Sequence, residues 1–301
     1  MKKFLSGGDE RLVSKSIRKG FPVFMLPTFI AFIIGFIWPF IQGMYLSFCD
    51  FIIVKDAEWI GFGNYKEALA DPGFRYSFVY TAAFAIVSII AINVLAFTVA
   101  YFLTQKIKGA NLFRTVFFMP NLIGGIVLGY IWSLIFDGIL TKYGTYLLAE
   151  TKFGFWGLLI LMCWQQVGYM MIVYIAGLQS VSEDMIEAAK IDGANKWQTL
   201  IKITIPNVMS SITVCVFLTL TNSFKLFDQN MALTGGAPVI FEADGTMINS
   251  TEMLALNIYN TFYAGSGNRG VAQAKAVLFF ILVAVLAVVQ LKATREKEVQ
   301  Q

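Results

Sequence analysis

The chain has 301 residues, of which 57% are hydrophobic and 14% are charged, and its mean hydropathy is +0.67. Soluble domains are typically about 45–50% apolar and about 25% charged, so this composition indicates a membrane protein. The net charge of +4 comes without a concentrated basic stripe, which argues against nucleic acid as a partner, and the lack of any histidine removes the usual general base and the commonest metal ligand.

A helix needs about 20 apolar residues to cross the hydrocarbon core of a bilayer. Six segments qualify, and we expect helices at about 21–48, 78–104, 113–136, 155–180, 207–229 and 271–292. The predicted fold is therefore an all-α polytopic membrane protein, with a six-helix domain over 21–292 between a tail at 1–20 and a tail at 293–301. Pro27 and Pro39 predict bends in the first helix, whose freed backbone groups neighbouring helices must cover.

The distribution of lysine and arginine predicts how the chain is oriented. With the N-terminus in the cytoplasm, 15 of the 23 Lys and Arg residues fall in cytoplasmic segments and 8 fall outside. Cytoplasmic segments near membrane helices are enriched in these residues. We therefore expect both tails and the segment at 182–206 to be cytoplasmic.

Two of the expected external segments show local signals. In the first, at 49–77, Asn64 and Glu67 fit an N-cap and its reciprocal partner, which predicts a short surface helix. The last, at about 230–270, holds many turn residues around the helical-looking STEMLALNIYNTFY. Its GSGNRG at 265–270 matches a dinucleotide-binding pattern but follows no predicted strand, so we interpret it as a flexible turn.

Ionisable groups are missing from the apolar cores of the predicted spans, because Lys225, Asp228 and Lys275 fall toward the outer ends. Machines driven by protons or by membrane voltage usually carry intramembrane ionisable groups. This argues against a proton-coupled carrier, whereas sodium coupling through backbone carbonyls stays open. The sequence has no GxxxxGK[ST] loop, so any nucleotide that drives transport would bind to a partner.

Neutral polar side chains do occur in the middle of the fourth and fifth spans. The candidate substrate-pathway residues are Gln165, Gln166, Tyr169, Thr219, Asn222 and Ser223. The last three share one helix face by their i, i+3, i+4 spacing, and the adjacent glutamines point about 100° apart, so one neighbour does not easily satisfy both. Such groups either hydrogen-bond neighbouring helices or line a site for a solute. Amides, hydroxyls and aromatic rings suit a neutral polyol or sugar.

A polar, helix-prone segment at 182–206 separates these two spans. Ser180 and Glu183 fit an S-x-x-E capping box at the start of a helix. Gly193 fits the C′ position that ends this helix, where a positive φ costs glycine little.

A second short helix is expected directly afterwards. Asn195 with Gln198 predicts its start, and Pro206 predicts the first turn of the next span. The two short amphipathic helices would lie either on the lipid headgroups or in a socket on a partner protein. The acidic side chains disfavour a surface of anionic lipid and favour the socket.

The same segment carries EAAKIDGANKWQTLIKITIP, which resembles the EAA signature of the transmembrane subunits of binding-protein-dependent ABC importers. The residues that match this pattern are Glu187, Ala188, Ala189, Asp192, Gly193, Ala194, Ile203 and Pro206. FGNYKEAL and DPGFRYSFVYT at 62–81 resemble the carbohydrate-uptake branch, as do SFKLFDQNMALTGGAP at 223–238 and ALNIYNTFY at 255–263. The pattern is similar to that of the maltose-type, first-permease (F-type) class.

This resemblance implies a set of partners and a location. A second homologous permease would complete the pathway, two copies of a cytoplasmic ABC ATPase would bind ATP and Mg, and an extracellular solute-binding protein would deliver sugar. This chain itself would be non-catalytic and would bind no cofactor or metal. It would lie in membrane lipid as a multi-pass protein of the bacterial cytoplasmic (inner) membrane.

The resemblance also implies the roles of the hairpin at 182–206, which would insert into a cleft of the ATPase as a coupling helix. The implied ATPase-coupling residues are Glu187, Ala188, Ala189, Asp192, Gly193, Ala194 and Pro206. Glu187 would make a polar contact to the ATPase and Gly193 would form the bend. The alternative is a secondary carrier or channel for a neutral polar solute, which would need no ATPase partner and no socket.

Overall fold

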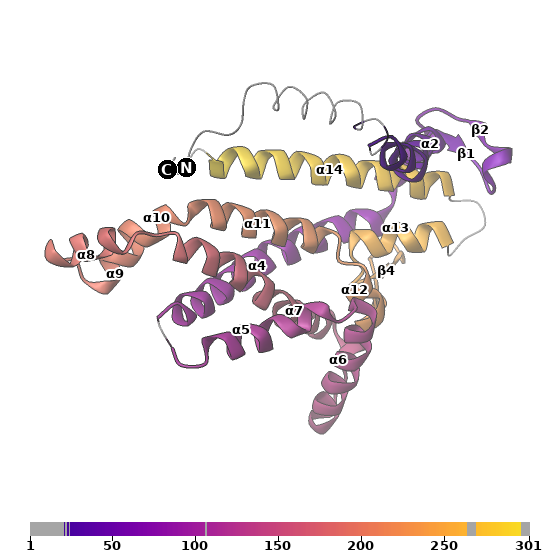
Figure 1. The fold of residues 1–301 in the computed structure, drawn as a ribbon. Helices are drawn as coiled ribbons and strands as arrows, with labels where there is room; N and C mark the ends of the chain where they lie inside the picture. The colour runs from indigo at the N-terminus through magenta and orange to yellow at the C-terminus, as the bar shows by residue number, and fades with distance from the viewer. Residues whose placement is uncertain (1–20, 22, 24, 106, 264–268, 296–301) are drawn as a thin grey trace, which may run out of the picture.

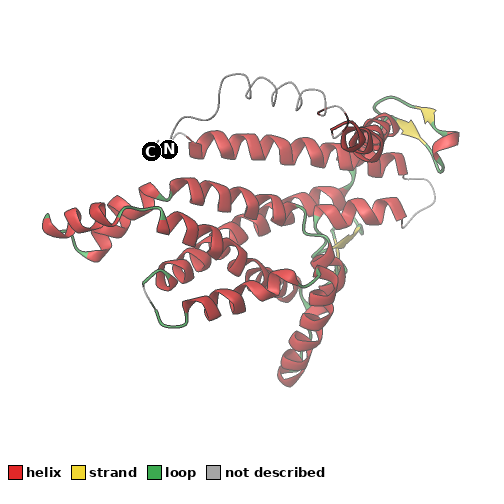
Figure 2. Ribbon diagram, in the orientation of Figure 1, coloured by secondary structure: helices red, strands yellow, loops and turns green. Residues whose placement is uncertain are grey.

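The computed structural model describes residues 21, 23, 25–105, 107–263 and 269–295. Helices, long and short, make up most of this part of the chain, together with two small β-hairpins (Figures 1 and 2). The predicted all-α polytopic membrane fold is confirmed. The tail at 1–20 lies outside the described residues.

Five helical segments of the described chain are long and apolar enough to cross a membrane: Met25–Leu46, Pro72–Leu103, Gly125–Tyr143, Thr151–Gln179 and Arg269–Ala293. A sixth span arises if the bent pair Lys196–Asn207 and Met209–Phe224 is counted as one, although its halves meet at an angle of 71°.

The third predicted span, 113–136, is not one helix. The chain there forms α5 (Ala110–Phe118), a 3₁₀ turn (Met119–Leu122) and α6 (Gly125–Leu140). Pro120 has no N–H to continue the helix, and Ile123 and Gly124 are extended, with ψ angles of 133° and 140°. The helix therefore breaks, and α6 rather than 113–136 provides the third apolar span.

Prolines also shape the first span and the entry to the fifth. A π-helical turn, η1 (Ile33–Ile37), precedes Pro39 in α2 (Trp38–Leu46), and a second one, η6 (Leu200–Thr204), precedes Pro206 in α10 (Ile205–Asn207). A proline ring clashes with the carbonyl four residues earlier, and a wider turn relieves this clash. At Pro39, where a bend was predicted, the structure has a π turn directly before α2, and Met25–Leu46 continues as one helical span.

The centre of the molecule is α7 (Thr151–Gln179), which packs against α4 (Pro72–Leu103) and α11 (Met209–Phe224). In the most apolar stretch of α7, 61% of the residues are buried. Gly168 allows an unusually close approach of the chain at Phe117, because a β-carbon at Gly168 would lie 1.8 Å from the Phe117 carbonyl oxygen. Small residues at such contacts let helix backbones pack tightly.

Other helices lie at the periphery with their apolar side chains exposed. Figure 1 shows α2 nearly end-on where it crosses α14 (Arg269–Arg295), and Phe40 packs edge-to-face on Phe280 with 5.2 Å between ring centres. In the first span only 6% of the most apolar stretch is buried. The single chain thus leaves large apolar surfaces that lipid or another protein must cover.

One end of the bundle carries the shorter elements. These are β1 (Cys49–Asp50), β2 (Glu58–Trp59), α3 (Gly63–Ala70), α12 (Asp228–Leu233), β3 (Val239–Phe241), β4 (Met247–Asn249) and α13 (Leu254–Tyr263). Both hairpins are antiparallel, with Cys49 opposite Trp59 and Ile240 opposite Ile248. The short helices α8 (Glu183–Ile191) and α9 (Lys196–Thr199) lie at the opposite end, as does the C-terminal end of α14 (Figure 1).

Two local predictions concern the end that carries the β-hairpins. Asn64 is not the N-cap of α3, since Phe62 holds that position. The buried Asn64 amide instead donates hydrogen bonds to the carbonyls of Ser47 and Cys49, at 3.0 and 2.8 Å, and so ties α3 to β1. Of the GSGNRG segment, Arg269 and Gly270 begin α14, and the rest lies outside the described residues.

Candidate functional site

The hairpin at 182–206 begins with α8, which ends in a left-handed glycine. Gly193 has a φ of +82° and donates to the Lys190 carbonyl at 3.1 Å, while the Ala194 N–H donates to the Ala189 carbonyl at 2.9 Å. These two backbone bonds form a Schellman motif, which satisfies carbonyls at the end of the helix. The predicted role of Gly193 as the C′ residue is confirmed.

The predicted capping box between Ser180 and Glu183 is wrong. Helix α7 extends to Gln179, so Ser180 lies at the end of that helix and its hydroxyl donates to the Gly177 carbonyl at 2.8 Å. Ser182 holds the N-cap position of α8.

The second predicted capping box is confirmed. The Asn195 side chain accepts a hydrogen bond from the Gln198 N–H, and the Gln198 side chain accepts one from the Asn195 N–H, both at 2.9 Å. This reciprocal pair starts α9 directly after the turn and leaves Trp197 69% exposed, while Ile191 is 86% exposed. The hairpin is therefore locally rigid, yet it presents large apolar side chains to its surroundings.

The residues predicted to contact the ATPase differ in exposure. Glu187, Ala188, Asp192 and Gly193 are exposed, Ala194 and Pro206 are partly buried, and Ala189 is buried inside the hairpin. A β-carbon added at Gly193 would meet no atom within 4 Å. Within this chain, only the backbone conformation therefore demands glycine at position 193.

The polar residues predicted to line the substrate pathway differ in their hydrogen-bond partners and in their burial. Asn222 of α11 donates to the side-chain oxygen of Gln166 on α7 at 2.9 Å. The neighbouring Gln165 accepts from Gln229 of α12 at 2.7 Å and donates to the Ile123 carbonyl at 3.2 Å. The two adjacent glutamines thus bond to different elements, as their angular separation predicted.

Thr219 and Ser223 are fully buried. The Thr219 hydroxyl donates to the Cys215 carbonyl and the Ser223 hydroxyl donates to the Thr219 carbonyl, each at 2.8 Å along α11. Tyr169, in contrast, is only partly buried. The structure therefore brings Gln166 and Asn222 together at a partly open position and keeps Thr219 and Ser223 inside the packing of this conformation.

Sequence analysis missed one mid-span interaction. The Tyr174 hydroxyl on α7 donates to the Asn93 side chain on α4 at 2.7 Å, and the Asn93 amide donates to the Thr219 hydroxyl at 3.2 Å. The chain of contacts joins α4, α7 and α11. The available signal was Asn93 itself, a lone amide in the long apolar run of α4.

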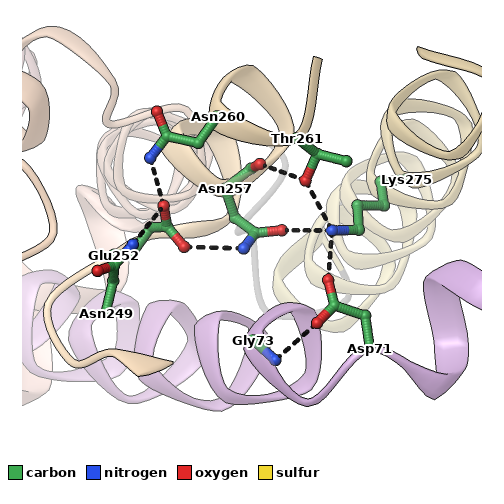
Figure 3. A network of polar contacts seen from close by, with 8 residues as sticks. All are labelled: Asp71, Gly73, Asn249, Glu252, Asn257, Asn260, Thr261 and Lys275. Carbon is green, nitrogen blue, oxygen red and sulfur yellow. Dashed lines mark hydrogen bonds and ion pairs between the residues drawn. The ribbon is translucent and has the colours of Figure 1, made fainter. Parts of the chain in front are cut away.

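A second missed feature is a buried ionic network at the end that carries the β-hairpins (Figure 3). Lys275, predicted toward the outer end of the sixth span, is only 1% exposed. Its ammonium donates to Asp71 at 2.5 Å, to Thr261 at 2.7 Å and to Asn257 at 3.0 Å. Asp71 also accepts from the Gly73 N–H as the N-cap of α4.

The same network includes a buried carboxylate. Glu252, 4% exposed, accepts hydrogen bonds from the side-chain amides of Asn249, Asn257 and Asn260. Asn257 therefore bridges the carboxylate and the Lys275 ammonium. These contacts fasten α13 to α4 and α14, so the segments at this end form a fixed layer over the bundle.

A family model described as the binding-protein-dependent transport system inner membrane component matches residues 108–293, a stretch that contains the hairpin at 182–206, α11 and most of α14. The chain belongs to this family. The EAA signature therefore led to the correct family, and the described chain provides the helical membrane fold that this family requires.

Full-length relatives are similar over nearly the whole chain. The probable starch degradation products transport system permease protein AmyD of Thermoanaerobacterium thermosulfurigenes is 42% identical, over 92% of this chain and 94% of the relative. The multiple sugar-binding transport system permease protein MsmF of Streptococcus mutans is 30% identical, over 92% and 95%. The predicted membership of the carbohydrate-uptake permeases is confirmed.

Solved structures agree on the fold. A bacterial ABC transporter involved in the import of the acidic polysaccharide alginate superposes with a TM-score of 0.77 at 19% identity, covering 94% of this chain and 98% of the other. At that identity the likeness shows the fold alone. Together with the family match, it supports a permease subunit of an importer and not the alternative of a secondary carrier or channel.

Proposed function

We propose that this permease subunit forms half of the membrane pathway of an ATP-driven sugar importer. The hairpin at 182–206 would couple this pathway to a cytoplasmic ATPase. The observation that carries the proposal is the hairpin itself. Backbone bonds around Gly193 and the Asn195 capping box make it rigid, while Ile191 and Trp197 are left exposed. A rigid element with exposed apolar side chains suits insertion into a cleft of a partner protein.

The partner at the hairpin would be one of two copies of a cytoplasmic ATPase, which would hold ATP and Mg. Glu187 and Asp192 are exposed for polar contacts, and no ion pair of the described residues involves Glu187. Buried Ala189 would hold α8 against the rest of the hairpin. Ala188 and Ala194 would allow a close approach, and Pro206 would begin the lever that leads into α11.

The joint between hairpin and membrane supports this transmission. The helical segment Lys196–Asn207 meets Met209–Phe224 at 71°, so a push on α9 would act on α11 from the side. Helix α11 carries Asn222 and is bonded to α7 through Gln166. We infer that a movement of the hairpin changes how these two helices expose their polar groups.

The solute would pass between this subunit and a second, homologous permease. Gln166, Asn222 and Tyr169, which are partly open, would contact its hydroxyl groups first. Gln165, Thr219 and Ser223 are buried here and would reach the solute only after α7 and α11 shift. The names of the relatives AmyD and MsmF support starch degradation products or other neutral sugars as the solute class.

The remaining surfaces fit the other proposed partners. Lipid and the second permease would cover the first span and α6, and an extracellular solute-binding protein would dock at the end with the β-hairpins. The end that carries the hairpin at 182–206 and both chain termini would then face the cytoplasm. The protein would lie in the bacterial cytoplasmic (inner) membrane. The chain would be non-catalytic and bind no cofactor itself.

Uptake in membranes that contain the two permeases, the ATPase and the binding protein tests this function. We expect ATP-dependent uptake of a neutral oligosaccharide such as maltotriose or raffinose. Gly193→Asp should abolish uptake, whereas the chain should still insert into the membrane.

The matched control for this experiment is Gly144→Asp. Gly144 also has a positive φ, +74°, with no atom within 4 Å of an added β-carbon, but it lies outside the hairpin. We expect Gly144→Asp to keep uptake. Sugar uptake that persists without the ATPase would show a secondary carrier or channel and would contradict the proposal.

A further inference from the structure

A hollow in the surface lies at the other end of the molecule from the hairpin at 182–206, between α13 and α14. A hollow of about 420 Å³ opens there, which is within the size range of ligand pockets, about 300–1,000 Å³. Its lining residues are Phe227, Ala255, Ile258, Tyr259, Phe262, Tyr263, Ala272, Gln273 and Ala276. We call this the outer aromatic hollow.

The arrangement of α13 explains why these side chains gather. Ala255, Ile258, Tyr259 and Phe262 follow an i, i+3, i+4, i+7 pattern and so share one face of the helix. The neighbouring face of α13 carries Asn257 and Thr261, which are bonded to Lys275 in the network of Figure 3, as is seen at the right of that view. The buried network therefore fixes the rotation of α13 and holds its aromatic face toward the hollow.

The aromatic rings form a continuous row of contacts. The ring centres of Phe227 and Tyr259 are 5.0 Å apart, those of Tyr259 and Tyr263 4.6 Å, and those of Tyr263 and Phe262 5.0 Å. Tyr259 and Tyr263 are 36% and 67% exposed, so the row is accessible. Alanines on both helices leave room beside the rings.

The chemistry of the lining selects a neutral, hydroxylated ligand. No lining residue is ionisable near neutral pH, which disfavours a carboxylate, phosphate or amine. Aromatic faces pack on the apolar C–H faces of sugar rings, and tyrosine hydroxyls offer a polar handle beside that surface. The side-chain amide of Gln273 has no hydrogen-bond partner among the described residues and could bond sugar hydroxyls.

The position of the hollow along α14 favours sugar over a lipid chain. Its lining residues Ala272, Gln273 and Ala276 flank Lys275, whose ammonium bonds to Asp71 and two polar side chains. Ionic groups of this kind belong near the membrane–water boundary rather than in the hydrocarbon core. The hollow thus lies at the level of the network, which is on the external side of the membrane in the orientation proposed above.

We propose that the outer aromatic hollow is a sugar-binding subsite at the external mouth of the pathway, separate from the mid-span pair Gln166 and Asn222. Tyr259 and Tyr263 stack on sugar rings, and Gln273 bonds their hydroxyls. This inference rests on the proposed function as a sugar importer. It adds that the solute binds to this subunit before it reaches the middle of the membrane.

Protection of an introduced cysteine tests the subsite in the complete transporter. Ala255→Cys places a thiol in the lining with little change of volume, and its rate of reaction with a membrane-impermeant thiol reagent is followed in lipid nanodiscs. The probe is maltotriose, or whichever neutral sugar of the panel the unmodified transporter takes up. We expect the sugar to slow labelling at position 255, and the same sugar to leave labelling of Tyr143→Cys unchanged, since Tyr143 is 80% exposed at another site.

Two variants in the Ala255→Cys background identify the cause of protection. Tyr259→Ala with Tyr263→Ala should raise the sugar concentration needed for half-protection about tenfold, which corresponds to about 1.4 kcal/mol. Tyr259→Phe with Tyr263→Phe keeps the rings and should shift it far less.

Each contrary outcome overturns the inference. Equal labelling rates with and without a transported sugar, or protection by lipid and not by sugar, mean that the hollow is no sugar subsite, while the proposed function stands because uptake was measured first. Protection that survives the double alanine variant also contradicts the role of the tyrosines. If the unmodified transporter takes up no sugar, the proposed function itself fails.

Discussion

The ammonium of Lys275 lies 2.5 Å from a carboxylate oxygen of Asp71, although the two residues are 204 positions apart in the chain. The Lys275 side chain is 2% exposed and that of Asp71 is 33% exposed. Since Asp71 also caps the N-terminus of α4, this ion pair joins the start of the second span to the start of the last. Breaking it should leave a buried charge without its partner.

Removing one member of this pair should therefore destabilise the fold strongly. We expect Asp71→Asn, which leaves the buried Lys275 ammonium without its counter-charge, to lower the free energy of unfolding by about 3–5 kcal/mol. Combining it with Lys275→Met should cost less than the sum of the two single changes. Thermal unfolding of the purified chain in detergent measures both effects.

The exposed pair of Lys152 and Glu150 is the control, at 2.7 Å with side chains 61% and 53% exposed. Glu150→Gln should change stability by no more than about 1 kcal/mol. Equal losses for Glu150→Gln and Asp71→Asn would contradict the structural role given to the buried pair.

A methyl group at Gly168 should disrupt the packing of α7. The added carbon would lie 1.8 Å from the Phe117 carbonyl oxygen, a backbone atom that moves only with its helix. We expect Gly168→Ala to destabilise the chain by about 3 kcal/mol, the upper end of what overpacking of a tight core typically costs. Gly138→Ala in α6 meets no atom within 4 Å and should be neutral or stabilising by up to about 1 kcal/mol. A melting temperature unchanged by Gly168→Ala would refute this contact.

Substitutions at Gly193 separate backbone strain from partner contact. A non-glycine residue pays about 1–2 kcal/mol for the left-handed conformation, and asparagine pays less than a β-branched residue. If strain alone matters, uptake should fall most for Gly193→Val and less for Gly193→Asn and Gly193→Asp. We expect instead that Gly193→Asp lowers uptake more than Gly193→Val, because the partner adds a close contact that an extra charge disturbs. ATPase activity coupled to sugar uptake provides the measurement.

The pathway residues should divide into two groups. Thr219→Val removes a hydroxyl that donates to the Cys215 carbonyl and accepts from Asn93, so we expect a loss of stability of about 1 kcal/mol and a smaller loss of uptake than Asn222→Ala causes. Asn222→Ala opens the pair with Gln166 at a partly exposed position and should lower uptake at least tenfold with little change in melting temperature. A large loss of uptake for Thr219→Val and a small one for Asn222→Ala would indicate that the solute contacts the buried face of α11. Uptake and unfolding are measured on the same preparations.

Part of the fold follows directly from the amino-acid pattern. Long apolar runs predict spans without any knowledge of tertiary contacts, and five of the six are found as helices of the described chain or as the bent pair. The third fails because Pro120 and the extended Ile123 interrupt an apolar run that hydropathy reads as continuous. Hydropathy sums side chains and does not register a break in backbone hydrogen bonding.

Part of the candidate site could also be predicted from the sequence. The turn at Gly193 and the reciprocal pair of Asn195 and Gln198 depend on neighbours within a few positions, so local spacing suffices to predict them. The capping box predicted at Ser180 failed because α7 continues to Gln179. Packing, rather than the local sequence, decides where such a long helix ends.

By itself, the sequence determined the membrane class, the family and the local form of the hairpin, because composition, a contiguous signature and short-range capping all act along the chain. Only the tertiary structure decided that Gln166 meets Asn222, that Lys275 pairs with Asp71, and that the aromatic face of α13 borders a hollow. These contacts join residues tens to hundreds of positions apart. Their partners are chosen by how helices rotate and pack, and such rotations leave no periodic trace in the order of the amino acids.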